Sequence, residues 1–341
     1  MKVAILAPIT WRTPPRNYGP WEQVASVLTE ALVKSGLDVT LFATGDSVTQ
    51  SKLQSVRQKP LGEHPADAKV WECLHISQLM ERATEFTIIH NHFDFLPLTY
   101  SRLINTPVIT TIHGFSSAEI IPVFKKYNEH SYYVSISNSD RHPELQYLDT
   151  VYNGIDERLF QFGSGQGDYL LYFGRMHPHK GAHEAIQIAI QSDKKLLLCG
   201  LIQDENYFKE RVSPFLNDST IVYKGNVGAR ERNELLGNAL ALLHPISFEE
   251  PFGLSVAEAM LCGTPVIAFN RGSMKEVIID RKTGLLVNTI AEAVEAVRTL
   301  NQISRRACRD HAMIKFSSQV MARHYIHLYD SVIKKSKYRR R

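Results

Sequence analysis

Two carboxylates, Glu250 and Glu258, lie on either side of a Pro-Phe-Gly turn in the second half of the chain. The residues from Leu254 onward suit a helix, so the segment 252–254 is expected to form a helix N-terminus. The unpaired N–H groups and the dipole of such an end favour an anion, typically a phosphate. Glu258, about one turn further along, would repel that phosphate. It is better suited to accept hydrogen bonds from sugar hydroxyl groups, although paired acid/base catalysis by the two carboxylates is the alternative.

Two cations precede a second expected helix. An expected strand ends at Phe173, a Gly174-Arg175 turn follows, and Lys180-Gly181 begins a helix. Arg175 could bind a phosphate through two hydrogen bonds, and Lys180 could add a point charge. The alternative is that both are ordinary surface cations. Their place at the carboxyl end of a strand, where ligands bind in open α/β sheets, favours the phosphate site. The GxxxxGK[ST] order of a P-loop is absent.

Histidines follow two other expected strands. His113 follows the strand 108–112, and the sequence leaves open whether it is a site residue or a structural hydrogen bonder. The run from His90 to Asp94 resembles a short set of metal ligands. No metal site is expected there, because alternate residues at a strand end point apart and no convergent ligands occur elsewhere. No GxSxG or Cys-His signature of a nucleophile is present.

The composition is that of a soluble, two-domain protein: 341 residues, of which 44% are hydrophobic and 22% charged. No apolar run approaches the ~20 residues of a membrane span. The apolar run 3–8 is too short for a signal peptide. The four scattered cysteines indicate reduced thiols, so a cytoplasmic protein is expected.

The end of the chain is strongly basic although the net charge is only +4. Residues 334–341 carry six cations and no anion. They form either a solvated tail or a weak anchor to anionic lipid, in which each cation contributes ~1 kcal/mol. The second reading would place the protein peripherally at the inner membrane face. Nucleic-acid binding is not expected, because no basic groove interleaved with aromatic residues accompanies the tail.

Strand and helix signals alternate along the whole chain, which predicts an α/β protein with doubly wound parallel sheets. The glycine-rich segment 163–167 is interpreted as the linker between two Rossmann-like halves. The expected domains are residues 1–160 and 161–318, followed by a terminal helix and the basic tail at 319–341. Strands are expected at residues 3–7, 38–43, 87–90, 107–112 and 132–136, and then at 169–173, 195–199, 220–223, 239–243 and 265–269.

Together these motifs resemble family 4 of the retaining glycosyltransferases, which have the GT-B fold. The resemblance rests on the Glu-x7-Glu of residues 250–258, the Gly-Arg…Lys-Gly of 174–181, the Asn-Gly-Ile-Asp of 153–156 and His113-Gly114. These motifs run through nearly the whole chain in the family's order. The resemblance implies two Rossmann-like domains facing across a cleft, with an acceptor domain first and a nucleotide-sugar donor domain second. It also implies a terminal helix that crosses back to the first domain.

The resemblance also implies roles for individual residues. Arg175 and Lys180 would neutralise the diphosphate and stabilise the leaving group, so that no metal or other cofactor is needed. Glu250 would hold hydroxyls of the donor sugar, Glu258 would hold the ribose hydroxyls, and His113 would orient the sugar. Further donor contacts would come from Gly174, Asn226, Val227, Pro251, Phe252, Gly253 and Leu254.

The first loop departs from the family pattern. Where the family usually has a Gly-Gly pair before its helix, this chain has Gly19-Pro20. Pro20 has no N–H for a donor phosphate, so the amide of Gly19 is expected to substitute. Pro20 suits the first turn of a helix, which is therefore still expected. Trp11, Arg12 and Trp21 are interpreted as a wall of the acceptor site.

The resulting hypothesis is transfer of a hexosyl unit from a nucleotide-diphospho-sugar to an acceptor hydroxyl, with retention of configuration. UDP-sugars are favoured by family habit, and GDP-mannose comes second. The acceptor would be a glycan, a glycolipid or a small molecule. One alternative is a GT-B enzyme that epimerises, hydrolyses or phosphorolyses a sugar. Another is a catalytically silent module that binds nucleotides or membranes.

Overall fold

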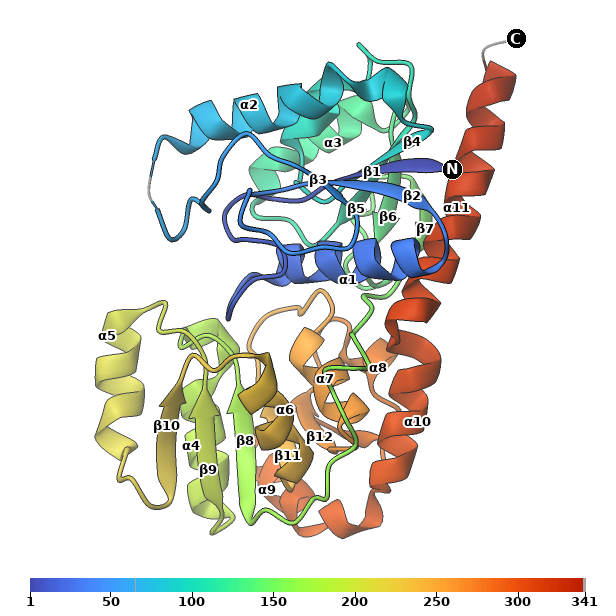
Figure 1. Cartoon of the computed structure of the whole chain (residues 1–341). Coiled ribbons are helices and arrows are strands. Elements are labelled where there is room, and N and C mark those ends of the chain that lie inside the picture. The colour runs from blue at the N-terminus through green and yellow to red at the C-terminus, as the bar shows by residue number, and fades with distance from the viewer. Residues whose placement is uncertain (65, 340–341) are drawn as a thin grey trace. The chain divides into compact units, whose positions relative to one another are not determined.

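The chain folds into two compact units, each built around one parallel sheet (Figure 1). The computed structural model describes residues 1–64 and 66–339, with side chains described up to Ser336. The first unit comprises Met1–Gly154 and the terminal helix from Ser318 onward, and the second comprises Ile155–Ser317. The α/β class and the doubly wound parallel sheets predicted from the alternating signals are confirmed.

The first unit contains a seven-stranded sheet in the order β3-β2-β1-β4-β5-β6-β7. Because β1 lies between β2 and β4, the strand order reverses there, and ligands of open α/β sheets bind at the carboxyl ends of the strands at such a point. The strands are β1 (Lys2–Leu6), β2 (Asp38–Phe42), β3 (Lys52–Gln54), β4 (Ile88–Asn91), β5 (Val108–Ile112), β6 (Tyr132–Ser135) and β7 (Tyr147–Thr150).

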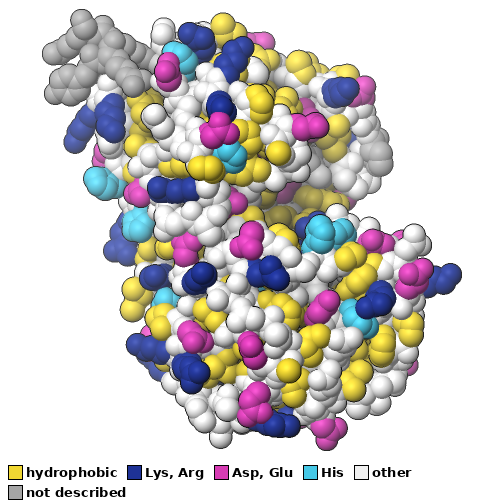
Figure 2. Space-filling view, turned by 180° about the vertical axis from the view of Figure 1, so that it is seen from behind, with side chains coloured by type: hydrophobic (Ala, Val, Ile, Leu, Met, Phe, Trp, Pro, Cys, Tyr) yellow, Lys and Arg dark blue, Asp and Glu magenta, His cyan; other side chains and the backbone are white. Residues whose placement is uncertain are grey.

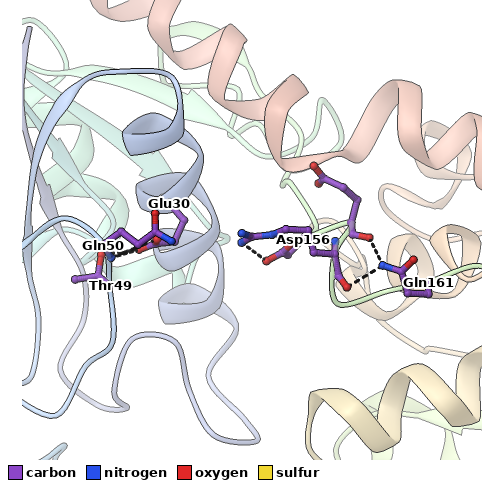
Figure 3. Close-up of polar contacts among 7 residues, drawn as sticks. Glu30, Thr49, Gln50, Asp156 and Gln161 are labelled. Atoms are coloured by element: carbon purple, nitrogen blue, oxygen red, sulfur yellow. Dashed lines mark hydrogen bonds and ion pairs between the residues drawn. The ribbon is translucent and has the colours of Figure 1, made fainter.

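Four α-helices flank this sheet: α1 (Pro20–Lys34), α2 (Ala68–Met80), α3 (Ile121–Tyr127) and α11 (Ser318–Arg339). Helix α1 packs against β1, β2 and α11, whereas α2 packs against β1. Pro20 occupies the first turn of α1, where its missing N–H costs no hydrogen bond. Glu30 of α1 accepts hydrogen bonds from Thr49 Oγ1 at 2.6 Å and Gln50 N at 3.1 Å (Figure 3). These bonds tie the loop after β2 to the helix.

The second unit contains a six-stranded sheet in the order β10-β9-β8-β11-β12-β13. Its order reverses between β8 and β11, so the loops that follow these two strands meet at the carboxyl edge of the sheet. The strands are β8 (Tyr169–Phe173), β9 (Lys195–Cys199), β10 (Ile221–Gly225), β11 (Ala241–His244), β12 (Val266–Phe269) and β13 (Gly284–Val287).

Helices cover both faces of the second sheet (Figure 1). Leu170 and Tyr172 of β8 point to the face where α4 and α9 pack, and the two helices bury the main core of the unit there. Helix α7 packs against β11 and β12, with α6 and α10 beside it. The helices are α4 (Ala182–Gln191), α5 (Glu205–Tyr207), α6 (Ala229–Asn238), α7 (Leu254–Leu261), α8 (Met274–Val277), α9 (Ile290–Arg298) and α10 (Arg305–Phe316).

The glycine-rich segment 163–167 is not the linker between the units. The chain passes from one unit to the other at Gly154 and Ile155, before residue 160. The N–H groups of Gly163, Gly165 and Gly167 all donate hydrogen bonds to backbone oxygens of the second unit. A Cβ at Gly163 would lie 2.1 Å from the carbonyl oxygen of Gly237. These glycines therefore serve close backbone packing rather than flexibility.

The segment directly after the crossing is held by its own side chains. Arg158 pairs with Asp156 at 2.8 Å, and Gln161 Nε2 donates to the carbonyl oxygens of Glu157 and Arg158 at 3.0 and 2.8 Å (Figure 3). Asp156 belongs to the Asn-Gly-Ile-Asp motif. In the structure, Asp156 therefore stabilises a local turn at the start of the second unit.

Charge on the surface is mixed. Figure 2 shows Lys, Arg, Asp and Glu side chains interspersed over the face drawn, in keeping with the small net charge. The basic tail predicted at residues 334–341 lies largely outside the described side chains, of which Lys334 and Lys335 are exposed. Among the described residues, no helix combines the length and the apolar character that crossing a membrane requires.

Candidate functional site

The loops after β8 and β11 are in close contact at the switch point of the second sheet. Gly181 adopts a left-handed conformation with φ 76°, and a Cβ there would lie 2.0 Å from the carbonyl oxygen of Pro245. The N–H of Ser247 donates to the carbonyl oxygen of His179 at 3.0 Å. Glycine is therefore needed at position 181, because a side chain there would prevent this approach of the two backbones.

The predicted residues Lys180 and Glu250 form an ion pair across these two loops. Lys180 Nζ donates to Glu250 Oε2 at 2.7 Å, and the side chains are only 16% and 11% exposed. His244 Nε2 at the end of β11 lies 3.5 Å from the same oxygen. Burial raises the pKa of Glu250, but His244 and Lys180 outweigh burial and lower the pKa to about 2. Glu250 is thus an ionised carboxylate held by the Lys180 ammonium, with the His244 ring close to the same oxygen.

Aromatic contact completes the surroundings of Lys180. Its Nζ lies 4.4 Å from the centre of the Phe248 ring, a cation–π arrangement. Phe248 comes from the loop after β11, two residues before Glu250. The ammonium is therefore positioned by one carboxylate and one ring from the same loop.

Arg175 occupies the turn that directly follows β8. Its Nη1 donates to Gln203 Oε1 at 2.5 Å, and its carbonyl oxygen accepts from the hydroxyl of Tyr172 at 3.0 Å. The backbone around Gly174 is packed tightly, because a Cβ at Gly200 would lie 1.9 Å from the Gly174 carbonyl oxygen. Arg175 is partly exposed at the same strand edge as Lys180. The sequence therefore placed both cations correctly at the carboxyl end of β8.

Helix α7 begins where the Pro-Phe-Gly turn predicted. Gly253 is its N-cap with φ 84°, and Pro251 and Leu254 are partly exposed. Phe252 is buried against Phe316 of α10, with ring centroids 5.6 Å apart, so it can offer a ligand only its backbone. The preceding loop is held as well, because the N–H of Ser273 donates to the carbonyl oxygen of Glu250 at 2.9 Å.

Glu258 on α7 is paired with Arg232 on α6. Arg232 Nη1 donates to both carboxylate oxygens, at 3.0 and 3.1 Å. The Glu258 side chain is 4% exposed and the Arg232 side chain 16%. The guanidinium of Arg232 lies 4.6 Å from the centre of the Phe173 ring. Burial raises the pKa of Glu258, and Arg232 opposes this rise. The pairing with Arg232 therefore favours the carboxylate form of Glu258, which is the form that accepts hydrogen bonds from hydroxyl groups.

Replacing Arg232 with methionine is expected to lower the free energy of unfolding by about 3–5 kcal/mol at pH 8, because it leaves a buried carboxylate unpaired. The loss should shrink as the pH falls towards 5. In the variant, Glu258 binds a proton more tightly in the folded state than in the unfolded state. The free energy of unfolding of the variant therefore rises as the pH falls from 8. Urea unfolding at several pH values measures this, with the exposed Arg298→Met as control. Equal losses for the two variants would contradict the pairing.

The turn expected near the base lies beside these groups in the sheet. Strand β10 continues to Gly225, which is longer than predicted, and the Gly225 carbonyl oxygen accepts from the N–H of Gly200 at 2.8 Å. Asn226 is exposed, whereas the side chain of Val227 is buried. The carboxyl ends of β8, β9 and β10 therefore form one continuous edge that Arg175 and Asn226 share.

The predicted residues of the first unit gather near the start of α1. His113 stacks on Trp21 with ring centroids 5.7 Å apart, and its Nε2 lies 2.9 Å from Nδ1 of His92. Burial lowers the pKa of His113 to about 3, so the ring is neutral. Gly19 is the N-cap of α1 and is itself buried.

The other aromatic residue of the predicted acceptor wall is held by the same loop. The Trp11 ring packs edge-on against Tyr18, with centroids 6.4 Å apart, and the backbone N–H of Trp11 donates to Glu22 Oε1 at 3.0 Å. Burial raises the pKa of Glu22 to about 7. Trp11, Arg12 and Trp21 are all partly exposed. They are thus available to a ligand.

The two histidines at the end of β4 are held by hydrogen bonds and ring packing. The two ring nitrogens of His90 lie 2.6 Å from the hydroxyl of Tyr329 and 2.7 Å from Thr111 Oγ1. His92 packs against His90, with ring centroids 4.2 Å apart. Within the described part of the chain, no three His, Cys, Asp or Glu residues converge in a way that could hold a metal ion.

Sequence reasoning missed the partners of the predicted residues. Gln203 lies in the loop after β9, Arg232 on α6 and His244 at the end of β11, and the sequence suggests His92 only as a metal ligand. His244 ends strand β11, so the rule that selected His113 would also have selected it. No such signal marks Arg232. It lies on a polar helix that also carries Arg230, and the sequence does not distinguish the two arginines.

Comparisons with known proteins identify the family and the fold of the chain. Residues 22–158 match the family described as Glycosyltransferase Family 4, and residues 155–319 match Glycosyl transferases group 1. An uncharacterised 41.2 kDa protein from the cps region of Klebsiella pneumoniae is 31% identical over 169 residues, which are 48% of this chain and 46% of that protein. An uncharacterised glycosyltransferase of Methanocaldococcus jannaschii is 24% identical, covering 84% of this chain and 85% of its own.

Among solved structures, HepE of Anabaena in complex with UDP and glucose superposes with a TM-score of 0.75. The match covers 97% of this chain and 100% of HepE at 18% identity. The two family matches meet near the boundary between the structural units, and the fold match extends over both. The chain therefore belongs to family 4 of the glycosyltransferases and has their GT-B fold of two Rossmann-like domains.

Proposed function

We propose that this protein transfers a hexosyl unit from a UDP-sugar to an acceptor hydroxyl, with retention of the anomeric configuration. GDP-mannose is the second choice of donor. We assign donor binding to the second unit and acceptor binding to the first unit, where His113 and the partly exposed Trp11, Arg12 and Trp21 lie.

One observation carries this proposal: Arg175, Lys180 and Glu250 occupy the switch point of the second sheet. Two loops that follow β8 and β11 bring Lys180 and Glu250 to 2.7 Å, and Arg175 lies in the first of these loops. When the bond between the sugar and the diphosphate breaks, negative charge develops on the leaving phosphate. Cations already fixed in place stabilise that charge without reorganisation. We therefore assign this role to Arg175 and Lys180 and propose transfer without a metal ion.

The two carboxylates hold the donor's hydroxyl groups. Both contacts of Glu250 with Lys180 and His244 use Oε2, so Oε1 is the oxygen that we assign to hydroxyls of the hexose. We assign Glu258 to the ribose, because Arg232 helps to keep it ionised and it lies on the helix that starts at Gly253. The N–H groups at the start of α7 face the anion, as the dipole of a helix favours.

The preference for UDP is supported by a structural neighbour. HepE, which shares the fold, was solved with UDP and glucose. In this chain Asn226 is exposed at the edge that carries Arg175, where we place the base. The cytoplasmic location and the lipid contact of residues 334–341 are further parts of the proposal, based on the sequence.

The proposal is tested by incubating the protein with UDP-glucose, UDP-galactose, UDP-N-acetylglucosamine and GDP-mannose, with and without a panel of sugar and lipid acceptors. Nucleotide release that depends on an acceptor is expected. The anomeric proton coupling of the product, measured by NMR, should match that of the donor. Release without acceptor would indicate hydrolysis, and a changed coupling would contradict retention. Formation of an isomeric nucleotide sugar would indicate epimerisation instead.

A further inference from the structure

A pair of histidines links the carboxyl ends of two neighbouring strands in the first unit. His92 follows β4 and His113 follows β5, and the two strands pair in parallel. His92 Nδ1 and His113 Nε2 are 2.9 Å apart, and the ring centroids are 5.1 Å apart. A distance of this size between two ring nitrogens requires that one of them carries the proton and donates it.

The surroundings of the pair restrict which nitrogen donates. Desolvation lowers the pKa of both rings, so each is neutral and carries a single N–H. His92 Nε2 is buried and has no hydrogen-bond partner among the described residues. If His113 Nε2 were the donor, the proton of His92 would sit on this buried Nε2. A buried N–H that lacks a hydrogen-bond partner is rarer in proteins than a buried acceptor that lacks one. This difference favours an unprotonated Nε2 on His92.

We propose that His92 Nδ1–H donates to His113 Nε2 and thereby holds His113 as the tautomer protonated on Nδ1. His92 is then a positioning residue for His113. His113 then presents an N–H to the ligand. It therefore recognises an oxygen atom that accepts a hydrogen bond, such as the oxygen of a sugar hydroxyl group. It does not act as a general base, because its one lone pair is already engaged by His92.

Packing keeps both rings in this orientation. The Trp21 ring stacks on His113 with an interplanar angle of 22°. His92 packs against His90, which is fixed in turn by Thr111 and by Tyr329 of α11. A turn of the His92 ring would break its bond to His113. The terminal helix thus supports the tautomer through His90, although it touches neither member of the pair in these contacts.

The tautomer itself can be measured without any substrate. In protein labelled with ¹⁵N-histidine, two-bond ¹H–¹⁵N correlations at pH 7.5 distinguish a protonated ring nitrogen from an unprotonated one. Spectra of His92→Phe and His113→Phe assign the signals. The expected result is a protonated Nδ1 and an unprotonated Nε2 for His113. A proton on His113 Nε2 would overturn the inference, whatever the enzyme's substrate proves to be.

Turnover tests whether His92 positions His113 for the sugar, a consequence that rests on the proposed function. His92→Phe keeps the ring size but removes the donor, and we expect kcat/KM for the donor sugar to fall at least about tenfold. His92→Asn places a side-chain N–H near the position of Nδ1, so it should recover most of this loss. The exposed His130→Asn is the control and should match the wild type. A purely structural role predicts that the Asn variant, which packs worse, is the more damaged of the two.

Discussion

Replacing Arg175 with alanine is expected to lower kcat by about 100- to 1,000-fold, because it removes a fixed cation from the charge that develops on the leaving phosphate. The fold should survive, since Arg175 is partly exposed and its side chain contacts Gln203 at the edge of the sheet. Steady-state kinetics at saturating donor measures kcat, and circular dichroism monitors the fold.

Two further variants make this result specific. Arg298→Ala removes an exposed guanidinium of α9 that pairs with Glu295, and it should leave kcat unchanged. Arg175→Lys keeps the charge but not the planar fork, so its kcat should lie between those of the wild type and the alanine variant. Wild-type turnover in Arg175→Ala would remove Arg175 from the mechanism.

The second large effect concerns the ion pair of Lys180 with Glu250. Lys180→Met should abolish most turnover and lower the free energy of unfolding by about 3–5 kcal/mol, because Glu250 is left as a buried, less compensated charge. The double variant Lys180→Met/Glu250→Leu should regain much of the stability, since no lone charge remains, and it should stay inactive. Denaturant unfolding and the transfer assay measure the two properties. Recovery of turnover in the double variant would contradict the assigned roles.

The same pair predicts a pH dependence of stability. The pKa of Glu250 is lowered from 4.5 to about 2 in the folded state. A carboxyl group with a depressed pKa stabilises the fold above its unfolded pKa, and this contribution disappears as the pH falls through the folded value. The shift corresponds to about 3 kcal/mol, lost between about pH 5 and pH 2. Glu250→Gln should lack this part of the acid response, so that the wild-type and variant curves converge at low pH.

The fold class can be predicted from the sequence because each buried strand is a continuous apolar run. The apolar runs of β8 and β9 were placed at their observed ends. The sequence does not predict strands β3, β7 and β13, since they are three or four residues long and two of them, β3 and β7, bury no side chain. Their pairing comes from tertiary contacts at the side of a sheet, which no local pattern encodes.

The linker was misplaced for a related reason. A glycine-rich segment is compatible with a flexible connection and with tight packing of one backbone on another. The sequence favours the first interpretation at residues 163–167, but the structure contains the second. The distinction depends on Gly237 and Cys262, which lie far along the chain.

The candidate site shows the same division. Arg175, Lys180 and Glu250 could be predicted because strand ends and a helix start mark them. That Lys180 and Glu250 touch, and that Arg232 neutralises Glu258, follows from the order β8-β11 and from the packing of α6 on α7. The alternative of paired acid/base catalysis by the two carboxylates is not favoured, because each carboxylate pairs with a cation of its own.

The central claim is that the switch point of the second sheet binds a nucleoside diphosphate through Arg175 and Lys180. Isothermal titration of UDP, GDP and ADP into the wild type, Arg175→Ala and Arg298→Ala tests it most directly. We predict that UDP binds best, that Arg175→Ala weakens UDP binding by about 10- to 100-fold, as expected for lost charge-assisted hydrogen bonds, and that Arg298→Ala binds as the wild type does. Equal UDP affinity in all three proteins, or no binding of any nucleoside diphosphate, would contradict the account.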